Sequence, residues 1–144
     1  MSKLTVLFSI LCFICFGSVS AQDVFGMWKT IDDVSGEAKS IVEVYEEDGK
    51  VYGKVVKILD PTAPQNPICD ECTGDDKDQP IVGLKFIKGL TKDGDEYNGG
   101  KILDPENGKL YKCYITLEHA DKLKVRGYIG FALFGRTQYW YRAE

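Results

Sequence analysis

Val24-Phe25-Gly26-Met27-Trp28-Lys29-Thr30 is the stretch from which we derive the fold. It predicts a first β-strand that carries one large aromatic side chain near its start. Its expected partner is the far end of the chain, Thr137-Gln138-Tyr139-Trp140-Tyr141-Arg142, which is also rich in strand-forming residues. Pairing of these two segments would close the sheet on itself and remove the exposed edges that promote aggregation.

The chain between these two segments reads as a series of short strands. Runs rich in Val, Ile, Tyr and Phe alternate with Gly, Asp, Asn and Pro, and no sustained i, i+3, i+4 apolar pattern occurs. Asp48-Gly49 and Asn107-Gly108 are typical of tight turns between antiparallel strands. The sequence therefore predicts an all-β chain, a closed or nearly closed eight-stranded antiparallel up-and-down barrel. The predicted strands are residues 24–32, 39–45, 50–59, 81–87, 96–103, 109–118, 122–129 and 134–142.

Residues 1–21 have the three parts of a secretory signal peptide: a basic Lys3, an apolar run over 4–16, and small residues that end at Ala21. We expect residues 22–144 to form a single β-barrel domain that is periplasmic or secreted. The apolar run is shorter than the about 20 residues that a membrane span needs. No later stretch is as apolar, so we predict no transmembrane helix.

The net charge of the chain indicates which kinds of partner the protein can bind. The chain has 18 basic and 22 acidic residues, and its formal net charge is -4 at pH 7. Nucleic-acid-binding proteins carry a strongly basic surface, because release of counterions from the phosphate backbone drives their binding. The acidic surplus therefore argues against a nucleic-acid partner and favours solubility.

Gly26-Met27-Trp28 resembles the first strand of the lipocalin-like (calycin) barrels, in which an Arg from the last strand packs across the Trp. Arg142 matches that Arg, and Arg136 is the second candidate. A wider set of residues resembles the bacterial family called domain of unknown function 2147, over nearly all of residues 24–142. The resemblance implies a barrel closed by Trp28 and Arg142, and it implies no activity. The residues that carry it are Trp28, Asp48-Gly49-Lys50, Gly53-Lys54, Cys69, Cys72, Asp76-Lys77-Asp78, Pro80, Gly83, Gly100-Lys101-Ile102-Leu103-Asp104-Pro105, Val125-Arg126-Gly127-Tyr128, Phe134-Gly135-Arg136-Thr137, Trp140 and Arg142.

The interior of an eight-stranded barrel is either filled by side chains or wide enough for one small ligand, and the sequence leaves both open. Arg126 and Tyr128 share one face of their strand, similar to the Arg-x-Tyr with which fatty-acid-binding barrels hold a carboxylate. The alternation nevertheless makes the opposite face the apolar one, so this charged face is expected to meet water. Arg136 and Trp140 share a face of the last strand, and alternation does not decide whether it points inward. The candidate ligand-binding residues are Trp28, Arg126, Tyr128, Arg136 and Trp140.

Three cysteines follow the signal segment. Cys69 and Cys72 flank two acidic residues in the long irregular segment 60–79. Acidic neighbours disfavour the thiolate that a redox pair needs, so we predict a structural disulfide, with redox chemistry and metal binding as alternatives. Zinc would need Cys113 and His119 as further ligands, and their spacing is unlike that of a zinc finger. Cys113 is expected to be a buried free thiol, although pairing with a loop cysteine stays open.

The sequence predicts no catalytic residue, metal site or cofactor. His119 is the only histidine, and no Ser nucleophile motif accompanies it. Asp75, Asp76 and Asp78 lack EF-hand spacing and are read as a solvated loop rather than a calcium site. The first functional hypothesis is a binding module that takes a small, partly apolar molecule or lipid, anionic if an Arg contributes, into the barrel mouth. The second is an envelope protein-interaction module with a filled barrel, acting through the 60–80 loop, and the third is a thiol oxidoreductase.

Overall fold

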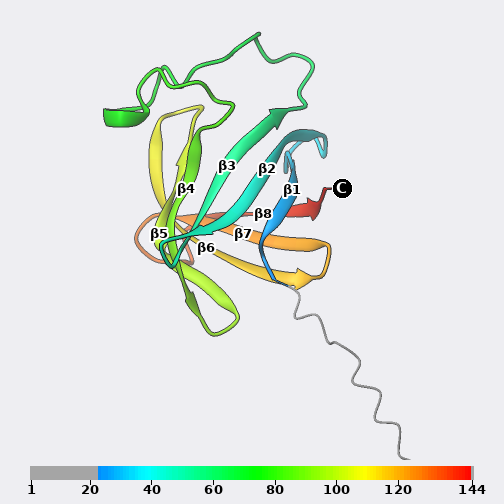
Figure 1. The fold of residues 1–144 in the computed structure, drawn as a ribbon, viewed down its shortest axis with the longest axis vertical. Helices are drawn as coiled ribbons and strands as arrows, with labels where there is room; N and C mark the ends of the chain where they lie inside the picture. The colour runs from blue at the N-terminus through cyan, green and yellow to red at the C-terminus, as the bar shows by residue number, and fades with distance from the viewer. Residues whose placement is uncertain (1–22, 144) are drawn as a thin grey trace, which may run out of the picture.

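A computed structural model describes residues 23–143 and shows an antiparallel barrel in which every strand pairs with its neighbour in sequence (Figure 1). The last strand pairs with the first, so the barrel is closed. The predicted all-β, eight-stranded up-and-down barrel is confirmed. The predicted signal peptide lies outside the described residues. The strands are β1 (Gly26–Ile31), β2 (Ala38–Glu47), β3 (Lys50–Ile58), β4 (Lys85–Asp93), β5 (Glu96–Asp104), β6 (Lys109–His119), β7 (Lys122–Tyr128) and β8 (Gly135–Arg142).

The barrel closes between β1 and β8 through a short ladder, in which Trp28 lies opposite Arg142 and Lys29 opposite Tyr141. Side chains reinforce this seam. The Arg142 guanidinium stacks 4.0 Å from the centre of the Trp28 ring, and the Trp28 indole N–H donates to Val24 O at 2.9 Å. The structure thus brings the predicted closing pair into contact at one end of the barrel.

The start of β4 differs from the prediction. The segment 81–87 was expected to be a strand because Ile81 and Val82 have high β-propensity. The structure starts β4 at Lys85, since Gly83 adopts φ +93° and Leu84 N donates to Ile81 O in a turn. That left-handed backbone conformation interrupts the extended chain before it joins the ladder.

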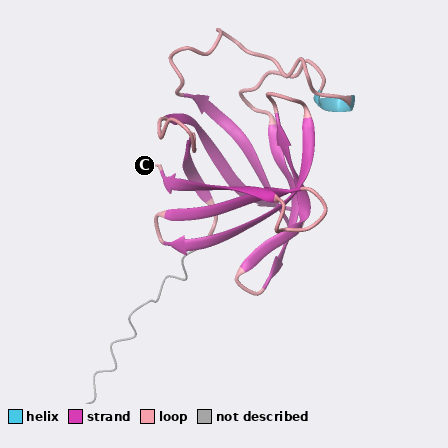
Figure 2. Cartoon of the chain, turned by 180° about the vertical axis from the view of Figure 1, so that it is seen from behind, coloured by secondary structure: helices cyan, strands magenta, loops and turns pink. Residues whose placement is uncertain are grey.

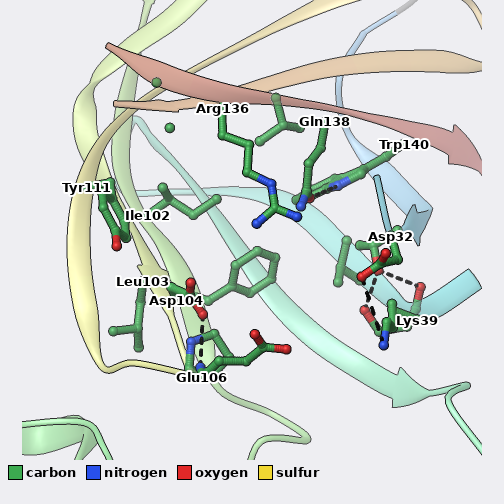
Figure 3. A pocket seen from close by; sticks show the side chains of 18 of the residues that line it. Asp32, Lys39, Ile102, Leu103, Asp104, Glu106, Tyr111, Arg136, Gln138 and Trp140 are labelled. Carbon is green, nitrogen blue, oxygen red and sulfur yellow. Dashed lines mark hydrogen bonds and ion pairs between the residues drawn. The ribbon is translucent and has the colours of Figure 1, made fainter. Parts of the chain in front are cut away.

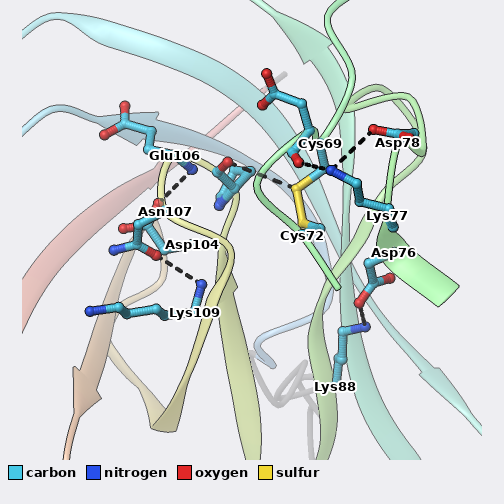
Figure 4. Close-up of a disulfide and its surroundings, with 12 residues drawn as sticks. Cys69, Cys72, Asp76, Lys77, Asp78, Lys88, Asp104, Glu106, Asn107 and Lys109 are labelled. Carbon is cyan, nitrogen blue, oxygen red and sulfur yellow. Dashed lines mark hydrogen bonds and ion pairs between the residues drawn. A yellow bond between two sulfur atoms is a disulfide. The ribbon is translucent and has the colours of Figure 1, made fainter. Parts of the chain in front are cut away.

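The long β3–β4 connection, residues 59–84, is ordered by its own bonds. The predicted Cys69–Cys72 disulfide is confirmed, and an isolated bridge joins Ile68 to Pro80 (Figure 4). Figure 2 shows this connection lying over one end of the barrel, with the short 3-10 helix η1 (Gly74–Asp76) at its side. A Cβ at Gly108 would come within 1.8 Å of Glu71 O, so the β5–β6 turn and this connection pack backbone to backbone.

The barrel core is apolar, and both tryptophans belong to it. Trp28 is 0% exposed and Trp140 is 2% exposed. Their burial, like that of Leu123 and Val125 on β7, shows which face of each strand points inward. Across the described residues, no helix is long and apolar enough to cross a membrane.

Candidate functional site

The end of the barrel opposite the Trp28–Arg142 seam contains a cavity of about 510 Å³. It is lined at its mouth by residues at the β1–β2, β5–β6 and β7–β8 ends of the barrel, among them Asp32, Glu106 and Arg136 (Figure 3). Its volume lies within the range of about 300–1,000 Å³ that is usual for small-molecule sites. The deeper wall is apolar and includes Val42, Val55, Phe86, Ile102, Leu103, Val125 and Trp140.

Trp140 forms part of the inner wall of the cavity. Its ring lies 5.9 Å from the ring of Phe86, centre to centre, and its indole N–H donates to the Gln138 side-chain oxygen at 3.3 Å. Tyr139 and Tyr141 are exposed on the outer face of the same strand. The structure thus resolves the alternation that the sequence left open: the Trp140 face of β8 points inward.

Arg136 is the cationic side chain that β8 presents at the cavity mouth (Figure 3). It shares the inward face with Trp140, four residues further along the strand. Its guanidinium donates through Nε and Nη2 to the two carboxylate oxygens of Asp33 in the β1–β2 turn. This hydrogen-bonded pairing lowers the pKa of Asp33 and raises that of Arg136. The forked guanidinium is therefore held at the mouth by one carboxylate, and that carboxylate belongs to a surface turn.

Two other carboxylates form local bonds at this end of the barrel: Asp32, which lines the mouth, and Asp60, which is paired with the lining residue Lys39. Asp32 accepts from the main-chain N–H groups of Val34 and Ser35, and these bonds lower its pKa. Asp60 accepts from Thr62 and from Lys39, whose Nζ lies 3.0 Å away, and its pKa falls to about 2. These carboxylates stabilise the turns through their hydrogen bonds.

The five candidate ligand residues do not gather at one place. Arg136 and Trp140 line the cavity, whereas Trp28 lies in the seam at the opposite end. The Arg126 guanidinium lies outside: it donates to Ala132 O at 2.8 Å, Leu133 O at 3.3 Å and Thr137 Oγ1 at 2.7 Å. The Tyr128 ring packs 6.3 Å from that of Tyr114 on the outer face, and Tyr128 only borders the cavity mouth.

The strand alternation explains this division. Leu123 and Val125 point inward, so the even-numbered positions of β7 face outward, as the alternation of the sequence predicts. Arg126, although a candidate ligand residue, does not line the cavity and instead holds the β7–β8 loop. Sequence reasoning missed Phe86 and Asp33. Phe86 was in a predicted strand whose inner face was not assigned. Asp33 contacts Arg136 across 103 positions, and no local pattern signals such a pair.

The three cysteines of the described residues are buried. Cys113 is free, and burial raises the pKa of its thiol to about 12. Cys69 and Cys72 are joined and lie against the β5–β6 turn, where Pro105 O is 3.8 Å from Cys69 Sγ. Thiol exchange requires access to a sulfur atom, so this burial argues against redox chemistry at the disulfide.

A closed eight-stranded antiparallel barrel, sealed at one end by a Trp–Arg stack and hollow at the other, is a lipocalin-like fold. Residues 26–142 match the family described as "Uncharacterized protein conserved in bacteria (DUF2147)", and the chain belongs to that family. Among solved structures it is similar to protein HP1028 from the human pathogen Helicobacter pylori, which is described as belonging to the lipocalin family. The TM-score is 0.73 and the identity 21%, over 85% of this chain and 84% of that one, so the likeness concerns the fold. No curated protein matches the chain.

Proposed function

We propose that this protein is an exported binding module that holds a small, partly apolar ligand in the cavity of about 510 Å³. The observation that carries the proposal is the combination of an apolar inner wall, formed by Trp140, Phe86 and Val125, with one guanidinium at the mouth. An apolar wall with a few placed polar groups is the usual composition of a small-molecule site. The disulfide supports an oxidising compartment.

The rim charges favour a ligand with a single negative charge. Arg136 offers a fork that suits a carboxylate. Asp32, Asp104 and Glu106 also line the mouth. Lys39 lines it too, but it is paired with Asp60 and lies 4.0 Å from Asp32, so the acidic groups outnumber the cations there and their field disfavours an approaching polyanion. A monocarboxylate with an apolar chain therefore suits the site better than a phosphate dianion.

The competing hypotheses receive less support. The cavity weighs against a filled barrel, and the buried disulfide weighs against a thiol oxidoreductase. The β3–β4 connection is tied to the β5–β6 turn at Gly108, which accounts for its order without a protein partner.

Titration of the purified protein with a chain-length series of alkyl monocarboxylates tests the proposal. Trp140 lines the cavity and Trp28 is buried at the other end, so a change in indole emission reports occupancy of the cavity. Native mass spectrometry before titration detects any ligand that the protein already carries. We expect saturable binding that strengthens with chain length, because each buried methylene adds about 0.8 kcal/mol.

Two variants and one control separate the cavity from the surface. Arg136→Ala removes the guanidinium and Val125→Phe fills the inner wall, so both should weaken binding about tenfold or more. Lys92→Ala, an exposed cation on β4 away from the mouth, should leave binding unchanged. Absence of any emission or melting-temperature change across the series, with no carried ligand, would overturn the proposal.

A further inference from the structure

The β7–β8 connection, residues 129–134, is an apolar loop on the rim of the barrel (Figure 1). Four of its six residues are large apolar side chains, and each is between 66% and 82% exposed. They are Ile129, Phe131, Leu133 and Phe134. Exposed apolar side chains are ordinary when scattered, but a contiguous cluster marks an interaction surface.

Several backbone groups of the apolar loop are hydrogen-bonded, while its large apolar side chains stay exposed. Arg126 donates to the carbonyl oxygens of Ala132 and Leu133. Ile129 N donates to Phe134 O at 3.1 Å, and Phe134 N donates to Phe131 O at 2.9 Å. Each polar group of the loop that is already bonded lowers the cost of moving the loop into an apolar medium.

The strands beside the apolar loop carry an unusual charge for this acidic protein. Strands β6, β7 and β8 hold seven basic residues and one acidic residue, Glu118, whereas the whole chain is at -4. Of the seven, Arg136 lies at the cavity mouth and Arg142 at the Trp28 seam. Alternation places Lys112, Lys122, Lys124 and Arg126 on their outer surface, together with Tyr114, Tyr128, Tyr139 and Tyr141. We call this outer surface of β6–β8 the basic face.

The cations of the basic face are not neutralised by acids. Lys122 Nζ lies 4.5 Å from the Tyr139 ring centre, and Lys124 Nζ lies 5.6 Å from that of Tyr114. Lys112 Nζ donates to Gly130 O at 3.3 Å. In the described part of the chain, none of these lysines forms an ion pair with a carboxylate.

We propose that the apolar loop and the basic face together dock this protein on an anionic lipid bilayer. The loop would insert Phe131 and Leu133 among the acyl chains, and the basic face would lie on the anionic headgroups. Tyrosines and lysines are the residues that favour this interface. The apolar loop favours a bilayer over a nucleic acid, whose phosphates offer nothing to bury Leu133. Ile129 and Phe134 also line the cavity, so docking would place the cavity mouth beside the lipid.

Co-sedimentation with vesicles tests the docking. We expect the protein to bind vesicles of phosphatidylcholine with phosphatidylglycerol, to bind phosphatidylcholine vesicles far less, and to be released by salt. Lys122→Gln with Lys124→Gln should weaken binding by about fivefold for each lysine. Phe131→Ser with Leu133→Ser should weaken it at least about tenfold.

Matched controls come from exposed residues elsewhere. Lys57→Gln with Lys92→Gln removes two cations on β3 and β4, and Ile68→Ser with Val82→Ser removes two exposed apolar side chains of the β3–β4 connection. Neither pair should alter vesicle binding. Losses as large as those from the basic face or the apolar loop would overturn the assignment of the docking surface.

A second measurement locates the inserted segment. Phe131→Trp places an indole in the apolar loop. Quenching by lipids brominated on the acyl chain that exceeds that of the wild type, whose Trp28 and Trp140 are buried, reports this position. Quenching by the anionic vesicles is expected. If the protein does not bind the vesicles, the proposal is overturned. Two alternative results would accompany that outcome: a dimer that Phe131→Ser with Leu133→Ser dissolves, or capture of a single-stranded oligonucleotide by the basic face.

Discussion

The two ends of this barrel each use a tryptophan and an arginine, and they use them differently. At the sealed end, Arg142 stacks on Trp28 and donates to the main-chain oxygens of Asp23, Phe25 and Ala120. At the open end, Arg136 shares a face with Trp140 and donates to the carboxylate of Asp33. The partners of Arg142 are fixed by the fold, whereas the partner of Arg136 is a side chain in a surface turn.

Arg142 is therefore a structural arginine, whereas Arg136 can exchange its carboxylate partner for another anion. A main-chain oxygen cannot leave without unfolding a segment, so the Arg142 contacts stabilise the closed barrel. A surface carboxylate can be replaced by another anion at little cost, because exposed ion pairs contribute only about 0–1 kcal/mol. The same residue type therefore seals one end and provides a binding group at the other.

The largest expected effect lies in the two tryptophans. Trp28→Ala should lower the free energy of unfolding by about 3–5 kcal/mol, because it leaves a cavity in a packed end and exposes the Arg142 seam. Trp140→Ala should cost less, since its ring already borders an open cavity that can rearrange. Urea unfolding of both variants measures the difference. Equal losses would show that the two ends are equally packed.

Removal of Arg142 should destabilise the protein more than removal of Arg136. Arg142→Ala removes four donated hydrogen bonds from a charged group, and we expect a loss of about 2–3 kcal/mol. Arg136→Ala should change stability by about 0.5 kcal/mol or less, since its ion pair is exposed. Thermal unfolding of each variant checks this. Arg142→Lys should fail to restore the loss, because an ammonium cannot reproduce the fork.

The pKa of the Cys113 thiol tests whether water from the cavity reaches the core of the barrel. Its folded pKa of about 12 lies above its usual value of 9.0. Below pH 9.0 the thiol is neutral in both states, whereas above it the unfolded chain releases the proton and the folded chain keeps it. Stability should therefore fall as the pH rises from 9 toward 12, by about 1.4 kcal/mol per pH unit.

The measurement for Cys113 is a comparison of unfolding free energies at pH 8 and pH 10 with those of Cys113→Ala. The variant lacks the thiol, so only the wild type should show the additional loss of about 1.4 kcal/mol. Tyrosine and lysine titration affects both proteins and cancels in the difference. Parallel pH curves would indicate that water from the cavity reaches the thiol.

Much of the sealed end was predictable from sequence, because its signals are local. Gly26-Met27-Trp28 and the alternation of β8 identify the two closing strands, and Asp48-Gly49 identifies a tight hairpin. The predicted start of β4 was wrong because the propensity of Ile81 and Val82 suggests a strand, whereas Gly83 has a positive φ and donates to Val55 O, a partner 28 residues away.

The open end was harder to predict, because its properties depend on distant groups. Arg136 and Trp140 could be named from the sequence, but the direction of their face depends on the whole closed sheet. Arg126 looked equivalent to Arg136 as a residue type. The alternation of β7 predicts that Arg126 lies outside, but only the packed barrel shows that it binds the loop carbonyls and that Arg136 borders the cavity.

The smallest expected effect concerns Asp33, and it tests whether Arg136 is open to exchange. If the Asp33 carboxylate competes with a ligand anion for the guanidinium, Asp33→Asn should raise the affinity for an alkyl monocarboxylate by about threefold, the size expected from an exposed ion pair. Its effect on stability should be minor. Isothermal titration calorimetry of the two proteins measures the change.

The pH dependence of binding sharpens this test. The hydrogen bonds from Arg136 lower the pKa of Asp33, so the pair persists above the usual carboxyl pKa and is lost as the pH falls through the lowered value. An alkyl sulfonate stays charged over that range. Its affinity for the wild type should rise as Asp33 takes up a proton, and its affinity for Asp33→Asn should lack that rise. A flat wild-type profile would mean that Asp33 and the ligand do not share Arg136, and the contrast between the two arginines would then be one of stability alone.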